Sequence, residues 1–170
     1  MKKARVLSTI CTSLLLASAG AQAQMPEGLC YAMRLSQQDL AQRPERGVQE
    51  LYVRFIALTR LDAENKGPWR HLRIRAVMAD QGQAVRDHAQ GAVLTQVAEC
   101  RTEQMECWAY DNQSFFTLRV HDAQMLELRT RDFEVADFGE SLVASNLAET
   151  IGRESVYMLE RLNSGPCPVE

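Results

Sequence analysis

The cysteines are the residues whose type and spacing predict chemistry most directly in this chain. Four of the five follow the N-terminal leader described below: Cys30, Cys100, Cys107 and Cys167. In an exported chain an even number of cysteines predicts disulfides, and four cysteines allow three connectivities. The simplest pairing joins Cys100 to Cys107 across a polar loop of hairpin length, and Cys30 to Cys167 across the two ends of the domain. The spacings match neither a CxxC redox motif nor a zinc finger, so we expect no metal at these cysteines.

The histidines and the nucleophilic residues form no pattern that predicts a catalytic or metal site. The three histidines are His71, His88 and His121, and no two lie close enough in sequence to form a local metal-binding or catalytic pair. Asp87 and Asp122 each adjoin a histidine, but neighbours along a strand point to opposite faces. The chain contains no G-x-S-x-G, S-x-x-K or H-E-x-x-H motif and no glycine-rich phosphate loop. The sequence therefore predicts a protein that is not an enzyme and uses no cofactor.

Residues 1–23 have the composition of a secretory signal peptide. Lys2, Lys3 and Arg5 come first, an uncharged stretch follows, and Ala21-Gln22-Ala23 forms an A-x-A cleavage signal. The uncharged stretch is too short and too rich in Ser, Thr and Gly to span a membrane. We therefore expect a mature protein that is periplasmic or secreted and has no stable membrane insertion.

The mature chain, residues 24–170, is long enough for one domain with a substantial core. No repeat, low-complexity run or Pro/Gly linker divides it. Removal of the three leader cations from the 19 basic residues leaves 16 against 22 acidic ones, a balance that argues against a nucleic-acid partner. All of these cations except Lys66 are arginines. We attribute this bias to base composition rather than to an anionic partner.

A period of two dominates the pattern of apolar residues and predicts strands. In residues 72–78 the even positions are apolar and the odd positions Arg73 and Arg75 are cationic, so the arginines are expected to face water. Residues 51–58 alternate less cleanly, which predicts a strand covered on both sides over part of its length. In the last segment we expect Val156 and Met158 to face the core. Similar patterns recur at residues 92–100, 105–110, 115–120, 126–129, 133–135 and 154–162.

Turn-forming groups separate these segments at regular spacing, as in Asn65-Lys66-Gly67-Pro68 and Asp80-Gln81-Gly82. The fold class predicted is all-β: an antiparallel meander of about eight strands that closes as a barrel or packs as a sandwich.

One short N-terminal helix is expected. Ser36 can cap residues 37–43, Asp39 stands at the third helical position to complete a capping box, and Pro44 prevents continuation. A second helical turn is compatible with residues 141–150, and the same segment is equally compatible with a strand and a loop.

The stretch Gly28-Leu29-Cys30-Tyr31, followed at residues 40–48 by LAQRPERGV, resembles the opening of a family of small, uncharacterised exported proteins of proteobacteria. In that family a Cys-Tyr pair precedes a short helix, a proline and the first long strand. The paired Cys100 and Cys107 and the closing Cys167 are also similar.

This resemblance covers nearly the whole mature chain and implies export and a similar fold. The family pattern has histidines around the helix, where this chain has Asp39 and Arg43. No role of those histidines carries over, and the resemblance implies no activity.

The function expected from these features is binding without chemistry. A compact domain held by disulfides can present its loops to another envelope or secreted protein, as an inhibitor or immunity protein does. One alternative is a lipocalin-like small-molecule carrier with an apolar cavity lined by Phe55, Trp69, Trp108 or Phe116. A further alternative is an envelope hydrolase, which requires a histidine and a carboxylate to converge in one cleft.

Overall fold

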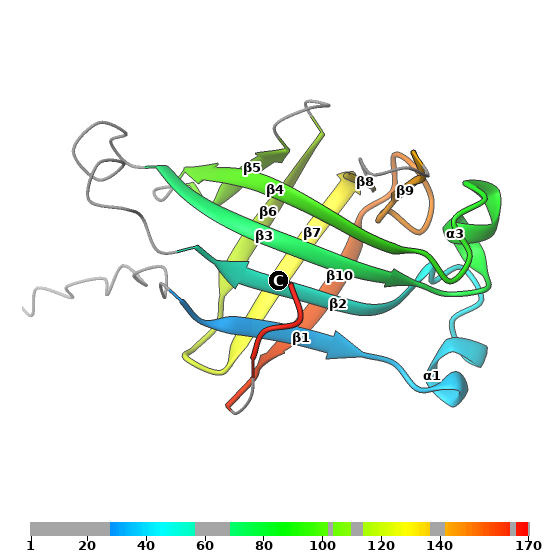
Figure 1. Cartoon of the computed structure of the whole chain (residues 1–170), viewed down its shortest axis with the longest axis horizontal. Helices are drawn as coiled ribbons and strands as arrows, with labels where there is room; N and C mark the ends of the chain where they lie inside the picture. Colours follow the sequence, from blue (N-terminus) through cyan, green and yellow to red (C-terminus); the bar gives the residue numbers. More distant parts are fainter. Residues whose placement is uncertain are drawn as a thin grey trace, which may run out of the picture.

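Eight antiparallel strands close into a barrel in the computed structural model of this chain (Figure 1). The structure describes residues 28–56, 69–101, 104–109, 114–136, 142–163 and 166–169. The predicted signal peptide, residues 1–23, lies outside this described part. Each barrel strand pairs with the next barrel strand along the chain, and β10 pairs with β1 to close the ring. The predicted antiparallel meander is therefore confirmed, with the barrel as its form.

The barrel strands are β1 (Cys30–Arg34), β2 (Val48–Phe55), β3 (Trp69–Met78), β4 (Val93–Arg101), β5 (Glu106–Ala109), β6 (Phe115–Val120), β7 (Met125–Asp132) and β10 (Ser155–Arg161). A separate hairpin of β8 (Glu134–Ala136) and β9 (Ala144–Asn146) is inserted between β7 and β10. In the described part of the chain, two short helices, α1 (Gln37–Ala41) and α3 (Gly82–Arg86), lie in the connections after β1 and β3.

The barrel interior is filled by side chains from alternate positions of the strands. Tyr31 and Phe55 pack edge to face with ring centroids 6.3 Å apart. Phe116 packs against Phe133 at 4.4 Å, and all four rings are at most 1% exposed. The predicted alternation in residues 72–78 is confirmed, because the even residues are buried and the arginines lie on the outer face.

The predicted orientation of the last strand is wrong. Tyr157 and Leu159 of β10 are buried in the core, whereas Met158 is 41% exposed and Val156 is half-buried. Apolar residues occupy both the odd and the even positions of this strand, so alternation in the sequence does not decide which set faces inward. The register with β7 decides it, because Tyr157 lies opposite the buried Leu128.

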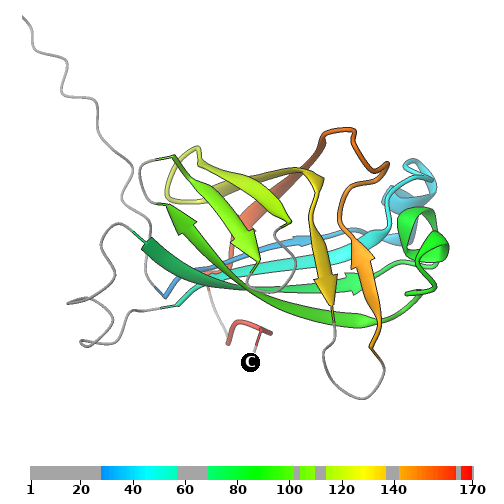
Figure 2. The ribbon, with the colours of Figure 1, turned by 90° about the horizontal axis from the view of Figure 1, so that it is seen from above.

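One end of the barrel, here called the helical end, is closed by α1, α3 and the β8–β9 hairpin (Figures 1 and 2). Arg46, between α1 and β2, is 6% exposed and donates from both terminal nitrogens to the carbonyl of Val156. Its guanidinium also stacks on the Tyr157 ring at 4.3 Å and forms an ion pair with Glu149. This network ties the β1–β2 connection to β10 across the end of the barrel.

The helices differ in part from expectation. The predicted capping box at α1 is present, since Ser36 accepts from the Asp39 amide and the Asp39 carboxylate accepts from the Ser36 amide. Residues 142–150 form β9 and a loop, the second of the two alternatives that their sequence left open. Helix α3 was not expected, because it begins at Gly82 in a segment that looks like a turn. Gly82 has a φ of +61°, and a Cβ there would lie 2.3 Å from the Glu45 carbonyl oxygen.

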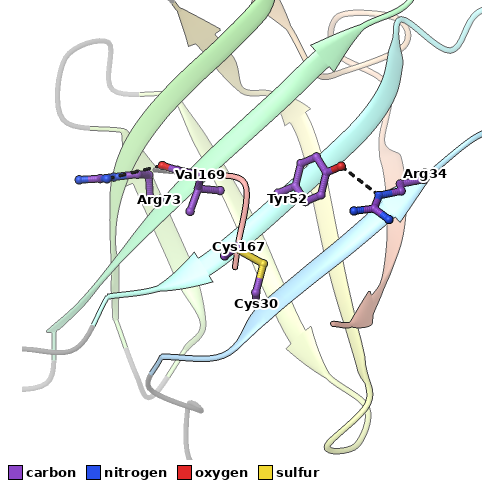
Figure 3. The surroundings of a disulfide bond; sticks show 6 residues. All are labelled: Cys30, Arg34, Tyr52, Arg73, Cys167 and Val169. Atoms are coloured by element: carbon purple, nitrogen blue, oxygen red, sulfur yellow. Dashed lines mark hydrogen bonds between the residues drawn. A yellow bond between two sulfur atoms is a disulfide. The ribbon is translucent and has the colours of Figure 1, made fainter. Parts of the chain in front are cut away.

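Both disulfides form with the simplest predicted pairing. Cys100 and Cys107 are directly opposed on β4 and β5 and point into the barrel, where both are fully buried. Cys30 and Cys167 lie on the outer face instead. Their bridge spans 137 positions of sequence and holds the C-terminal segment, residues 166–169, against the barrel wall (Figure 3).

Candidate functional site

A group of arginines gathers on the outer face of β1, β2 and β3. These residues, here called the arginine face, are Arg34, Arg54, Arg73 and Arg75. Each alternates along its strand with the residues that face the barrel core. Among the described residues at the outward positions of these three strands, Glu50 is the one acidic residue. A chain with a negative formal charge of −3 thus carries a local cationic surface.

The pairing of β2 with β3 places two of these cations face to face. Arg54 and Arg73 are Cα partners in the antiparallel ladder. Directly opposed like charges on one face of a sheet are destabilising, because the two side chains start only about 5 Å apart. The register thus brings two cationic side chains together on the outer face of the barrel.

The C-terminal segment crosses beside Arg73 (Figure 3). Cys167 bridges to Cys30 on β1, and Val169 is only 3% exposed. The segment packs on a small apolar cluster of the outer face that includes Ala32 and Tyr52. Arg73 donates through Nη1 to the Val169 carbonyl oxygen at 3.5 Å. A covalent bond, apolar contact and a long hydrogen bond thus hold the described part of this segment.

A hollow opens between β2, β3 and the C-terminal segment. It has a volume of about 280 Å³ and is lined by Arg54, Ile56, Arg73 and Val169. Of the lining residues that the structure describes, two are cationic and two are apolar. Ile56 directly follows β2, and Val169 is present at the hollow because the Cys30–Cys167 bridge holds its segment there.

Tyr52 organises the neighbouring part of the arginine face. Its hydroxyl donates to Glu50 Oε2 at 2.6 Å and accepts from Arg34 Nε at 2.9 Å. The guanidinium carbons of Arg34 and Arg75 lie 5.3 and 5.6 Å from its ring centroid, within cation–π range. Burial, and then the hydrogen bond to Glu50, raise the pKa of the Tyr52 phenol above its usual value. These contacts set the direction of the two arginines.

Of the candidate pocket residues, Phe55 and Phe116 belong to the core cluster inside the barrel, whereas Trp108 lies on its outer face. Phe55 and Phe116 are 1% and 0% exposed and help to fill the barrel interior. Trp108 is on the outer face of β5, since its neighbour Cys107 points inward, and it packs under Arg101 with 5.4 Å between the guanidinium carbon and the ring centroid. The side chain of Trp69 lies outside the described residues.

The histidines are dispersed over the molecule. Nε2 of His71 lies 3.3 Å from Glu99, and Nε2 of His121 lies 3.1 Å from Glu127. His88 is exposed, with a φ of 56°. Over the ranges that the structure describes, no group of three His, Cys, Asp or Glu side chains is placed to hold a metal ion. None of the helices in the same ranges has the length and apolar character needed to cross a membrane.

Part of this site has a signal in the sequence. The alternation of residues 72–78 indicated that Arg73 and Arg75 are outward, and the mixed alternation of residues 51–58 indicated cover on both faces of that strand. The cover is the C-terminal segment over Tyr52. What the sequence reasoning missed is the juxtaposition of Arg54 with Arg73, because alternation assigns a face to a residue but not a partner across the ladder.

Comparison of the chain with protein-family models, curated proteins and solved structures found no match.

Proposed function

We propose that this protein is exported to the bacterial periplasm or beyond, and that it acts without catalysis by binding another exported protein, as an inhibitor or immunity protein does. The arginine face is the surface that recognises the partner. The observation that carries the proposal is the juxtaposition of Arg54 and Arg73 beside a hollow, on a chain that is acidic as a whole.

The physical argument rests on charge segregation. Base composition can explain why arginine outnumbers lysine, but it does not explain why four arginines share the outer face of β1, β2 and β3, where Glu50 is the acidic residue among those that the structure describes. Guanidinium groups bind carboxylates with paired hydrogen bonds, and complementary charge speeds association with an acidic surface. The partner's contact surface is therefore acidic.

Two further features support an extracytoplasmic binding role. The disulfides are those expected of a protein in an oxidising compartment. The large side chains that fill the barrel, among them Phe55 and Phe116, leave the outer wall as the surface available for recognition. The carrier hypothesis needs those same two side chains to line an open cavity.

The proposal is tested by capture from periplasmic and culture-supernatant fractions with the immobilised mature protein as bait. The test variant is Arg54→Glu with Arg73→Glu. The matched control is Arg131→Glu with Arg153→Glu, which makes the same charge change at two exposed arginines away from the arginine face.

We expect at least one protein to be retained by the wild type and the control and lost with the test variant, and its retention to weaken as salt rises. Recovery of the same proteins with all three baits, or of none above background with the wild type, would overturn the proposal.

A further inference from the structure

Two members of the arginine face, Arg34 on β1 and Arg75 on β3, converge on one side chain of the strand between them. Tyr52 on β2 is the Cα partner of Arg75, and also of Ala32, two residues before Arg34. The guanidinium carbons of Arg34 and Arg75 lie 5.3 and 5.6 Å from the Tyr52 ring centroid. The two cationic groups therefore meet at one ring, although a whole strand separates their backbones.

The contact with the ring leaves hydrogen-bond donors available on both arginines. A guanidinium group has five N–H donors in a planar fork, and a cation–π contact consumes none of them. Arg34 uses Nε on the Tyr52 hydroxyl at 2.9 Å, and Arg75 contacts the ring alone. Among the described residues, no acceptor lies within hydrogen-bond distance of the terminal nitrogens of Arg34 or of any nitrogen of Arg75. Both forks can therefore still bind a carboxylate.

The charge around this pair is balanced on one side only. Glu50 is the Cα partner of Arg34, and its Oε2 accepts from the Tyr52 hydroxyl at 2.6 Å. The Cα partners of Arg75 on β2 and β4 are a tyrosine and a threonine, neither of which is anionic. Its neighbour on the same face of β3 is Arg73, a second cation. An anion bound near Arg75 would therefore offset charge that its strand partners leave uncompensated.

Tyr52 is held in place and is itself unsuited to bind the partner. It is 3% exposed and packs in the apolar cluster with Cys30 and Val169. Its hydroxyl accepts from Arg34 and donates to Glu50, and Figure 3 shows the Arg34 side chain directed at that hydroxyl. The role of Tyr52 is therefore to position the two guanidinium groups. Such preorganisation reduces the conformational entropy that long side chains lose on binding.

The pair of forks selects a ligand with two carboxylates. One guanidinium group binds one carboxylate through two parallel hydrogen bonds, so two groups from different strands can bind two. In an extended peptide, side chains at alternate positions point to the same side, about 7 Å apart. An extended segment with acidic residues at alternate positions therefore offers one carboxylate to each arginine, with a polar backbone suited to an exposed sheet surface.

We propose that Arg34 and Arg75, positioned by Tyr52, bind an extended acidic segment of the partner protein that carries carboxylate side chains at alternate residues, one on each guanidinium group. This inference rests on the proposed function, because it specifies the partner's contacting groups.

The experiment titrates capped peptides into the ¹⁵N-labelled mature protein at low salt and follows the Nε–Hε signals of Arg34 and Arg75 by NMR. The probe is Ac-Thr-Glu-Thr-Glu-Thr-NH₂, in which the two side-chain carboxylates are the only anions. Its analogue with both glutamates replaced by glutamine is the matched control ligand. Sodium sulfate carries the same two charges on a single centre. We expect the glutamate peptide to shift both signals and to bind at least about tenfold more tightly than either control.

Four variants locate the binding. Arg34→Lys and Arg75→Lys keep the charge and remove the fork, and each should weaken the glutamate peptide at least about fivefold. Arg131→Lys, at an exposed arginine on β7, is the matched control and should leave the affinity unchanged. Tyr52→Phe keeps the ring that Arg75 contacts and removes the acceptor of Arg34 Nε. It should shift the Arg34 Nε–Hε signal, leave that of Arg75 in place and weaken the peptide.

Equal affinity for the glutamate and glutamine peptides, or sulfate binding as tightly as the glutamate peptide, would overturn the inference. Full affinity in both lysine variants would do the same, since charge alone would then suffice. Unchanged binding and an unchanged Arg34 signal in Tyr52→Phe would reject Tyr52 as the positioning residue.

The two proposals can fail separately. A titration without binding, together with capture that depends on Arg54 and Arg73, would reject this inference and leave the proposed function standing. A successful titration without any captured protein would count against the proposed function alone.

Discussion

Arg54 and Arg73 face each other across the β2–β3 ladder, and both side chains line the hollow that Val169 closes on one side. The register of β2 with β3 places the two arginines opposite each other. The Cys30–Cys167 disulfide holds the segment that carries Val169 beside them. A carboxylate at either position would form a cross-strand ion pair with the opposite arginine, which two arginines do not form with each other. This contrast between stability and recognition yields the first prediction.

Arg73→Glu should make the protein slightly more stable and weaken its binding of an acidic partner. The new carboxylate lies opposite Arg54, and an opposed ion pair replaces an opposed like-charge pair, a change worth about 0.5 kcal/mol on a sheet surface. Urea unfolding measures the stability, and the capture assay measures the binding. A clear loss of stability would show that Arg73 has a structural role that the register does not explain.

Removal of the two disulfides should have unequal effects. The Cys30–Cys167 bridge closes a loop with a sequence separation of 137, against 7 for Cys100–Cys107. In the chain-entropy model these loops stabilise the fold by about 5 and about 2.5 kcal/mol respectively.

Cys30→Ala with Cys167→Ala should therefore lower the free energy of unfolding by about twice as much as Cys100→Ala with Cys107→Ala, measured by urea unfolding of both double variants. A larger loss from the second pair would mean that packing of the buried Cys100–Cys107 bridge inside the barrel outweighs loop entropy.

Arg46 should be among the most sensitive positions at the helical end. It is 6% exposed, contacts Glu149 and the Val156 carbonyl, and stacks on Tyr157. Arg46→Ala leaves these groups without their cationic partner and should cost about 3 kcal/mol of unfolding free energy.

Arg86→Ala is the matched control at the same end of the barrel. Arg86 also contacts acidic residues, through Glu45 Oε2 at 3.2 Å, but its side chain is 47% exposed. We expect a loss below about 1 kcal/mol. Similar losses in the two variants would show that Arg46 does not close the barrel end.

Stability should fall in acid partly through Glu127. This carboxylate, 6% exposed as a side chain, accepts from Arg129 Nε and lies 3.1 Å from His121 Nε2. The Arg129 hydrogen bond first, and then that from His121, hold the pKa of the Glu127 carboxyl below its usual value of 4.5, against the opposing effect of burial.

A folded-state pKa below the unfolded one contributes stability that is present above the unfolded pKa and is lost as pH falls through the folded one. Urea unfolding of the wild type should therefore show a stability that declines below about pH 4.5, and Glu127→Gln should show a shallower decline from a lower starting value. Identical pH slopes in the two proteins would exclude Glu127 as a contributor.

Several features of the fold could be read from local sequence because their causes are local. Alternation at residues 72–78 assigned both faces of β3 correctly, since one face meets the core and the other meets water. The Ser36–Asp39 capping box was predictable because its partners lie within one helical turn. The outward position of Trp108 follows from the inward Cys107 beside it, because neighbours along a strand point to opposite faces.

Other features failed for identifiable reasons. Strand β1 was not predicted, because four of its five residues are buried and no alternation is visible. It lies between the barrel core and the C-terminal segment, so both of its faces are covered. In β10 both the odd and the even positions carry apolar residues, so the sequence did not show which set faces the core. The register with β7 places Tyr157 inside and Met158 outside.

The sequence by itself determined the all-β class, the faces of the cleanest strands and the simplest disulfide pairing, because each depends on spacing within one segment or on a small number of cysteines. Only the tertiary structure decided that Arg54 lies opposite Arg73, that Val169 closes the hollow between them, and that Phe55 and Phe116 fill the barrel. The physical reason is that a two-residue period assigns a side chain to a face, while the register between strands and the path of a tethered terminus depend on contacts between distant parts of the chain.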